Sequence, residues 1–181
     1  MVTMNKAVID KQTLKDIRYL KMARIWSDNS YAIRRKVGCL IVSNDGSIVS
    51  DGYNGTPRGF ENVCEILDSE IQSKIEGLND EDQRKEIKRY ADKGIPTISK
   101  PYVLHAEANA ITKLARSTNS SEGCTLYCTD MPCVECSKLI IQAGIKRVVY
   151  ERDYRIHDGI ALLQRASVEV FNIPTDVIDS V

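Results

Sequence analysis

Two short motifs carry the side chains best suited to metal chemistry. One is an H-x-E sequence at His105 and Glu107, and the other is a P-C-x-x-C sequence at Cys133 and Cys136. We expect the second motif to open a helix, where residues three apart project to one side. Free backbone N–H groups at a helix start favour the thiolates that a metal requires. With the imidazole of His105, two thiolates leave the fourth tetrahedral position to water, as in a catalytic zinc site.

Glu107 is the candidate acid–base group beside this site. In a regular helix a residue two positions after His105 would point away from it. The two side chains converge only if His105 precedes the helix with extended backbone. Glu107 can then take a proton from a water molecule on the zinc and deliver it to a reacting group. This would join metal activation of water to general acid–base catalysis.

Two other interpretations of the cysteine motif remain open. A lone C-x-x-C sequence also occurs in redox proteins and in buried cores. A structural zinc site would need a fourth protein ligand, for which Cys128 is the nearest spare sulfur. Because Cys39, Cys124 and Cys128 lie in apolar, strand-like stretches, we expect them in the core. The pairing of two motifs, each at an expected helix start, favours the catalytic zinc site.

The composition is that of an ordinary globular chain. The 181 residues include 25 Lys and Arg and 25 Asp and Glu, so the formal net charge is zero. Proteins that grip the nucleic-acid backbone usually carry a basic excess, so we expect no nucleic-acid partner. No apolar run approaches the roughly 20 residues of a membrane span. We therefore expect a cytoplasmic protein, or one of the host cytoplasm if the source is a virus, whose six cysteines stay reduced.

Helical and strand-like stretches alternate along the chain. Helical periodicity and end signals predict helices at about 10–29, 106–116, 132–143 and 158–165. Branched apolar runs predict strands at 37–42, 47–50, 124–128, 146–150 and 168–171, the first two joined as a hairpin by an Asp-Gly turn. Glycine-rich 52–59 predicts a loop, and the mixed charges of 65–100 predict two solvated helices. This alternation indicates an α/β domain with a mixed, partly parallel sheet.

Three longer motifs occur in an order typical of one enzyme family. They are GYNGTPRG at 52–59, HAEANAI at 105–111 and MPCVEC at 131–136. In these motifs the chain resembles the cytidine/deoxycytidylate deaminase superfamily, and in particular its phage-type deoxycytidylate (dCMP) deaminase branch. The resemblance runs from about Val37 to Phe171.

The resemblance implies both a fold and an activity. The fold is a three-layer cytidine-deaminase-like α/β fold, a mixed five-stranded sheet with helices on both faces. It forms a single domain over residues 1–181, with a charged helical insertion at about 62–102. The activity is zinc-dependent hydrolytic deamination of dCMP to dUMP and ammonia, which supplies the precursor of thymidylate. The implied zinc ligands are His105, Cys133 and Cys136, the proton shuttle is Glu107, Asn54 holds the deoxyribose and Tyr154 closes over the pyrimidine.

Effectors and assembly are implied in the same way. Members of this branch are homohexamers that dCTP activates and dTTP inhibits, with Mg²⁺ accompanying the nucleotide effector. Some members also hold an accessory structural zinc ion. In this chain Ala32 and Val103 stand where two of its ligands would align, and Cys64 alone does not make a site. We therefore expect one catalytic zinc ion.

The sequence offers several candidates for the cation that would bind the substrate phosphate. A dianionic substrate should meet at least one cation. Five residues are candidates: Arg34, Arg35, Lys36, Arg58 and Arg155.

Other functions remain alternatives. A related deaminase could act on dCTP, a free cytidine nucleoside or an RNA base, although zero net charge disfavours RNA. A regulatory nucleotide-binding module of the same fold would have no need of Glu107 as a proton shuttle. A zinc-stabilised interaction scaffold would require four protein ligands and no open pocket. Asn54 and Tyr154 also have plain structural interpretations, as a turn residue and an ordinary surface residue.

Overall fold

The chain forms a five-stranded sheet in the order β2-β1-β5-β6-β7. A computed structural model describes residues 9–154 and 156–181. Strand β1 is antiparallel to both β2 and β5, whereas β5, β6 and β7 run parallel to one another. The strands are β1 (Gly38–Val42), β2 (Ile48–Tyr53), β5 (Thr125–Asp130), β6 (Arg147–Arg152) and β7 (Glu169–Asn172). The predicted mixed five-stranded α/β sheet is confirmed.

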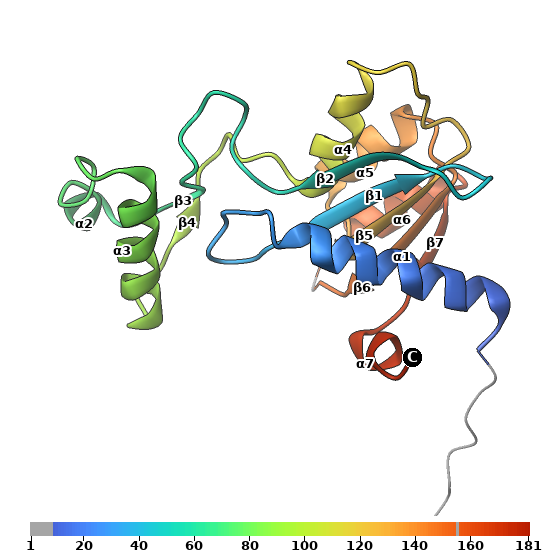
Figure 1. The fold of residues 1–181 in the computed structure, drawn as a ribbon, viewed down its shortest axis with the longest axis horizontal. Coiled ribbons are helices and arrows are strands. Elements are labelled where there is room, and N and C mark those ends of the chain that lie inside the picture. The colour runs from blue at the N-terminus through green and yellow to red at the C-terminus, as the bar shows by residue number, and fades with distance from the viewer. Residues whose placement is uncertain (1–8, 155) are drawn as a thin grey trace, which may run out of the picture.

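Helices cover both faces of this sheet (Figure 1). One face packs against α1 (Lys11–Ser27) and α7 (Thr175–Asp179). The other packs against α4 (Ala106–Leu114), α5 (Val134–Gln142) and α6 (Asp158–Arg165). None of the helices that the structure describes has the length and apolar character needed to cross a bilayer.

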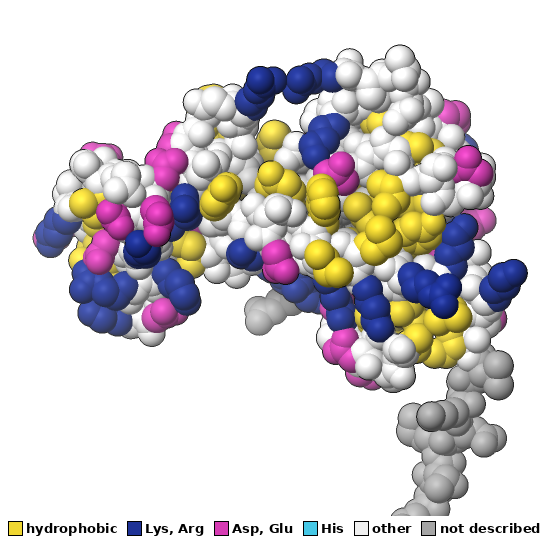
Figure 2. Space-filling model, viewed as in Figure 1, with side chains coloured by type: hydrophobic (Ala, Val, Ile, Leu, Met, Phe, Trp, Pro, Cys, Tyr) yellow, Lys and Arg dark blue, Asp and Glu magenta, His cyan; other side chains and the backbone are white. Residues whose placement is uncertain are grey.

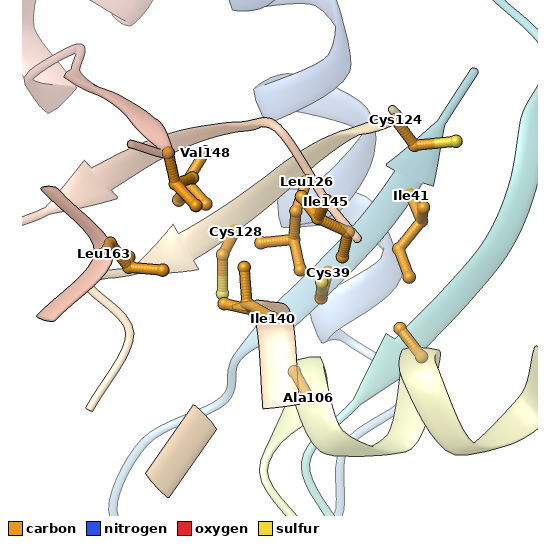
Figure 3. Packing of buried hydrophobic residues seen from close by; sticks show 12 residues of the cluster. Cys39, Ile41, Ala106, Cys124, Leu126, Cys128, Ile140, Ile145, Val148 and Leu163 are labelled. Atoms are coloured by element: carbon orange, nitrogen blue, oxygen red, sulfur yellow. The ribbon is translucent and has the colours of Figure 1, made fainter. Parts of the chain in front are cut away.

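Successive side chains of the central strands pack alternately into the two cores, one on each face of the sheet. In β5, Leu126 and Cys128 face α4 and α5, while Tyr127 faces α1. Successive side chains of a strand point to opposite faces, so a sheet covered on both sides is apolar at every position. Each fully buried aliphatic side chain contributes roughly 1.5–3 kcal/mol of transfer free energy. The packing is seen in Figure 3, where Cys39 and Cys128 come from neighbouring strands. The predicted core burial of Cys39, Cys124 and Cys128 is confirmed.

Residues 61–102 form a lobe beside the sheet, to its left in Figure 1. The elements of the lobe are β3 (Glu65–Ile66), α2 (Ser69–Gln72), α3 (Asp80–Asp92) and β4 (Ile98–Ser99). The two strands pair with each other and not with the main sheet. A small core of four buried side chains, Val63, Leu67, Ile75 and Ile87, holds the lobe together. Charged side chains of both signs lie on its outer face (Figure 2). The division into one domain with an insertion stays a prediction.

Several element boundaries differ from the sequence prediction. Of the two solvated helices expected in the lobe, the first is only the single turn of α2, and the short β3–β4 pair was not predicted. Helix α7 was also missed, because five residues carry too little periodicity to be recognised. Pro132 was predicted as the first residue of a helix but lies one residue before Cys133, the N-cap of α5.

Strand β2 continues through Gly52 and Tyr53, which the sequence assigned to a loop. Gly52 serves close packing here. A Cβ atom on Gly52 would lie 2.1 Å from the carbonyl oxygen of Ala106 and 2.6 Å from the main-chain nitrogen of Ala110. The first turn of α4 therefore rests directly on the backbone of β2. Because His105 and Glu107 flank Ala106, this contact fixes the height of both side chains above the sheet.

We predict that Gly52→Ala lowers the free energy of unfolding by about 1–3 kcal/mol, the usual cost of overpacking. The added methyl must push α4 away from β2, so zinc affinity should fall as well. Urea denaturation and zinc titration measure the two effects. Gly55→Ala is the matched control, because a Cβ atom there meets nothing within 4 Å. Equal stability of the two variants would contradict this account of the close contact.

Candidate active site

The H-x-E motif lies at the start of α4. His105 is the N-cap residue and has extended backbone, with φ −72° and ψ 157°. Its side chain therefore leaves the chain before the helical turn that carries Glu107. This is the geometry required for the two side chains to converge. Glu107 is 3% exposed, whereas His105 is accessible at the surface of the site.

The cysteine motif lies at the start of α5 in the same way. Cys133 is the N-cap residue, again with extended backbone, and Cys136 is buried in the first turn. Helix α6 presses against this turn through Gly159, where a Cβ atom would lie 2.3 Å from the carbonyl oxygen of Pro132. Two helix N-termini thus point at one place, and their partial positive charge stabilises thiolates.

The three candidate ligands have the spacing of a zinc site. The Nδ1 atom of His105 lies 3.5 Å from the Cys133 sulfur and 3.4 Å from the Cys136 sulfur. A tetrahedral zinc ion with ordinary Zn–S and Zn–N bonds separates such ligand atoms by about 3.5 Å. All three ligand atoms lie within 4.8 Å of one another. Two sulfurs and one imidazole nitrogen are also the donor set that zinc prefers.

The electrostatics of the pocket couple these groups. A hydrogen bond from Cys136, followed by one from His105, lowers the pKa of Cys133, and the same sulfur–sulfur contact raises the pKa of Cys136. The Cys133 contact raises the pKa of His105. Burial raises the pKa of Glu107 to about 7. A nearby cation would favour the ionised carboxylate and so oppose the effect of burial.

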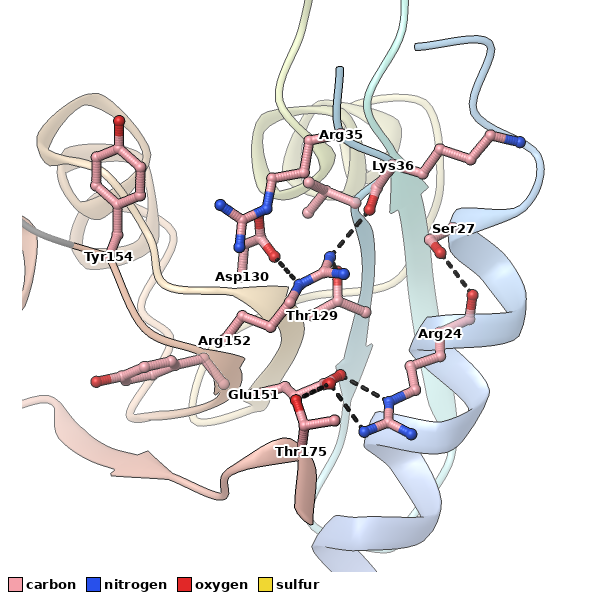
Figure 4. Close-up of polar contacts among 12 residues, drawn as sticks. Arg24, Ser27, Arg35, Lys36, Thr129, Asp130, Glu151, Arg152, Tyr154 and Thr175 are labelled. Atoms are coloured by element: carbon pink, nitrogen blue, oxygen red, sulfur yellow. Dashed lines mark hydrogen bonds and ion pairs between the residues drawn. The ribbon is translucent and has the colours of Figure 1, made fainter. Parts of the chain in front are cut away.

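These groups open into a cavity of about 500 Å³. Fourteen residues line it: Arg35, Val37, Asn54, Ser99, Lys100, Pro101, Val103, His105, Ala106, Glu107, Asp130, Met131, Cys133 and Tyr154. The cavity therefore brings together the H-x-E motif, one cysteine and both predicted substrate contacts. Tyr154 lies at its edge with 57% of its surface exposed. In Figure 4 the ring of Tyr154 stands apart from the arginines.

Asn54 has structural partners in addition to its place in the cavity. Its Oδ1 atom accepts a hydrogen bond from the main-chain N–H of Val37, and its Nδ2 atom donates to the carbonyl oxygen of Arg35. One amide N–H and one oxygen lone pair remain for a ligand. The deoxyribose contact of Asn54 stays a prediction.

One of the five candidate phosphate-binding cations lines the cavity. This is Arg35, whose Nε atom lies 2.7 Å from Asp130 Oδ2. Arg34, Lys36 and Arg58 do not line the cavity, and Arg155 falls outside the described residues.

Asp130 and Lys100 are cavity residues that the sequence prediction missed. Asp130 ends strand β5 and is shared by Arg35 and Arg152 (Figure 4). Its position just before the MPCVEC motif was the available signal, because the carboxyl end of a parallel strand is a common place for ligands. Lys100 reaches the cavity from the lobe, where its ammonium group pairs with Glu61 at 2.6 Å. No local pattern distinguishes Lys100 from the other lysines of the charged stretch.

No second metal cluster is evident among the residues that the structure describes. The only group of three close candidate ligands found there is His105, Cys133 and Cys136. The positions expected for an accessory site hold Ala32 and Cys64, both buried, and Val103, which lines the cavity. Cys128 is buried in the core cluster and does not belong to the close group of ligands.

Comparison with known proteins identifies the family. The family described as "Cytidine and deoxycytidylate deaminase zinc-binding region" matches residues 14–152, well over half of the chain. The chain belongs to the cytidine and deoxycytidylate deaminase family. His105, Cys133 and Cys136 form its zinc site.

Individual members of the deaminase family resemble the chain over most of its length. The deoxycytidylate deaminase of Enterobacteria phage T4 is 36% identical over 89% of this chain and 91% of its own length. The human deoxycytidylate deaminase is 34% identical over 78% of this chain and 66% of its own length. A solved dCMP deaminase from cyanophage S-TIM5, in complex with dCMP and dUMP, matches with a TM-score of 0.69 at 40% identity. That match covers 91% of this chain and 99% of the cyanophage chain.

We predict that Cys136→Ala lowers zinc affinity by more than about 100-fold, since changing even an outer partner of a metal ligand costs about 10- to 100-fold. Metal analysis and competition with a chromophoric chelator measure this. Cys124→Ala is the control, because Cys124 is buried in the core and does not belong to the close group of zinc ligands. Loss of zinc from both variants, or from neither, would contradict the assignment.

Proposed function

We propose that the chain catalyses the hydrolytic deamination of dCMP to dUMP and ammonia. The observation that carries the proposal is a single cavity lined both by Glu107 with two of the zinc ligands and by Arg35 with Asn54. The cavity thus offers acid–base chemistry together with a cation and an amide, as a nucleoside monophosphate requires. The cyanophage relative with dCMP and dUMP supports the same substrate.

The residues of the chain divide the chemistry among them. Bound at His105, Cys133 and Cys136, zinc supplies a Lewis acid that lowers the pKa of water. The carboxylate of Glu107 takes a proton from the attacking water and delivers it to N3 of the pyrimidine, beside the attacked C4. Glu107 then takes the second proton from the hydroxyl group added at C4 and gives it to the amino group, which leaves as ammonia as the C4 carbonyl forms. Burial raises the pKa of Glu107 and a bound cation would lower it, and a pKa near the working pH serves proton uptake and release alike.

Arg35 is the cation that we assign to the substrate phosphate. Its guanidinium group lines the cavity, and its partner Asp130 is also held by Arg152 at 2.5 Å. Arg152 donates further hydrogen bonds to Thr129 Oγ1 and the carbonyl oxygen of Lys36, so it anchors Asp130 independently. Two guanidinium groups on one carboxylate leave a net positive charge, which a phosphate dianion can neutralise.

The proposal also covers the assembly, regulation and location of the chain. We assign it a homohexameric state, activation by dCTP with Mg²⁺, inhibition by dTTP and a cytoplasmic location, all by resemblance to the family. Self-association also has a structural argument. Exposed apolar side chains gather between α1 and β2, namely Met22, Ile25, Trp26 and Ile48 (Figure 2). A contiguous apolar patch of this kind is typical of a protein–protein contact.

Ammonia release from four substrates tests the proposed activity. We expect the highest kcat/KM for dCMP, with dCTP, deoxycytidine and CMP all lower, because only dCMP combines a monophosphate with a deoxyribose. A preference for dCTP or for deoxycytidine would establish one of the related deaminases instead. Absence of ammonia from all four, with zinc bound, would contradict the proposal.

We predict that Glu107→Gln retains zinc but lowers kcat for dCMP by about 10²- to 10⁴-fold, the range for loss of a general acid–base group. Steady-state kinetics and metal analysis of the same preparation measure both quantities. Glu135→Gln is the matched control, since that carboxylate lies on the first turn of α5 but points to solvent and pairs with Lys138. Turnover by Glu107→Gln near that of the control would remove Glu107 from its proposed role.

A further inference from the structure

The segment that carries Arg35 has no regular secondary structure. Residues 28–37 connect α1 to β1. Main-chain polar groups need partners, and here side chains from distant parts of the chain supply many of them. Arg35 itself is exposed, so packing alone does not hold it. Its position depends on its ion pair with Asp130 and on the main chain on either side.

Glu65 of the lobe holds the main chain before Arg35. One carboxylate oxygen, Oε1, accepts hydrogen bonds from the N–H groups of Ile33 at 3.0 Å and Arg34 at 3.2 Å. Glu65 is 1% exposed, and its second oxygen has no partner among the described residues. Burying a carboxyl group with an unsatisfied oxygen costs free energy. The two main-chain hydrogen bonds to Oε1 offset part of that free-energy cost.

Asn54 holds the main chain after Arg35. Its side-chain hydrogen bonds reach the carbonyl oxygen of Arg35 at 2.9 Å and the N–H of Val37 at 2.8 Å. Glu65 and Asn54 therefore clamp Arg35 from its two sides, one from the lobe and one from the end of β2. The lobe also contributes Ser99 and Lys100 to the cavity, so it reaches the substrate site directly as well.

We propose that Glu65 is a positioning residue that, together with Asn54, presents Arg35 to the substrate phosphate. This step rests on the proposed function. Glu65 does not line the cavity and touches no reacting group. It acts through the main chain of Ile33 and Arg34, and through it the lobe determines phosphate affinity.

The position of Arg35 separates its effect from the chemical step. Arg35 pairs with Asp130 at the end of β5, while the proton shuttle Glu107 lies on α4. A contact to the phosphate is made equally in the bound substrate and in the transition state. Its loss therefore raises KM and leaves kcat nearly unchanged.

Four variants test the clamp. Glu65→Met removes both acceptors at similar volume, Glu65→Gln keeps one acceptor, and Arg35→Gln removes the charge. Ile87→Ala is the control, since it weakens the core of the lobe, against which Ile33 also packs, but leaves the carboxylate acceptor of Glu65 in place. We measure KM and kcat for dCMP, and the inhibition constants of dUMP and of deoxyuridine, which lacks the phosphate. Amide hydrogen exchange at Ile33 and Arg34 reports on the clamp directly.

We expect Glu65→Met to raise KM for dCMP about tenfold, the lower end of what a lost charge-assisted hydrogen bond costs, with kcat within about twofold. The inhibition constant of dUMP should rise with KM, and that of deoxyuridine should not. Arg35→Gln should repeat this pattern with a larger effect. Glu65→Gln and Ile87→Ala should stay near the unmodified protein. Amide exchange at Ile33 and Arg34 should quicken most in Glu65→Met, because only this variant removes the acceptor of both N–H groups.

Other results overturn the proposal. Three results would mean that Glu65 acts only on folding. They are equal rises in the inhibition constants of dUMP and deoxyuridine, a fall in kcat alone, or an equal rise in KM for dCMP in Ile87→Ala. An unchanged KM in Glu65→Met would exclude the positioning role. If Glu65→Met does not fold, fast exchange at Ile33 and Arg34 in the unmodified protein would still exclude the clamp. If the unmodified protein does not deaminate dCMP, the proposed function fails, and exchange alone then decides whether the clamp exists.

Discussion

The structure depends on the convergence of two helix N-termini on one point. Helices α4 and α5 each begin beside the sheet, and each is preceded by an extended residue, His105 or Cys133, whose side chain turns into the site. Such convergence needs close backbone contacts, which Gly52 allows beneath α4 and Gly159 allows beside α5. The ligands are thus placed by rigid elements, and the helix ends supply positive potential to the sulfurs.

Burial and a bound cation have opposite effects on the pKa of Glu107, and both bear on its chemistry. Glu107 is buried beside the ligands, which raises its pKa to about 7, while a bound cation lowers the pKa of any neighbouring acid. A carboxyl group under these opposing influences can both accept and return a proton. Cys133 shows the reverse case, since hydrogen bonds from Cys136 and His105 lower the pKa of its thiol. The same site therefore holds one acid whose pKa is raised and one whose pKa is lowered.

Sequence reasoning succeeded where the controlling forces were local. The helix start after His105 follows from residue type and spacing, the start of α5 was predicted two residues early, and the buried cysteines follow from apolar strand patterns. Gly52 was wrongly predicted as a loop residue, because its close packing against α4 leaves no signal in the residues next to it in the sequence. The contact of Glu65 with Ile33 was equally invisible, since it joins segments 32 residues apart. The choice of Arg35 among five cations likewise needed the fold, because all of them lie in polar stretches of similar composition.

The central claim is a metal site with three protein ligands and an open fourth position. X-ray absorption at the zinc edge of the purified protein tests it most directly, because sulfur and lighter ligands scatter differently at distances of about 2.3 Å and 2.0–2.1 Å. The account predicts two sulfur neighbours and two nitrogen or oxygen neighbours, one of which a small anion can replace. Three or four sulfur neighbours, or a protein that binds no zinc, would contradict it.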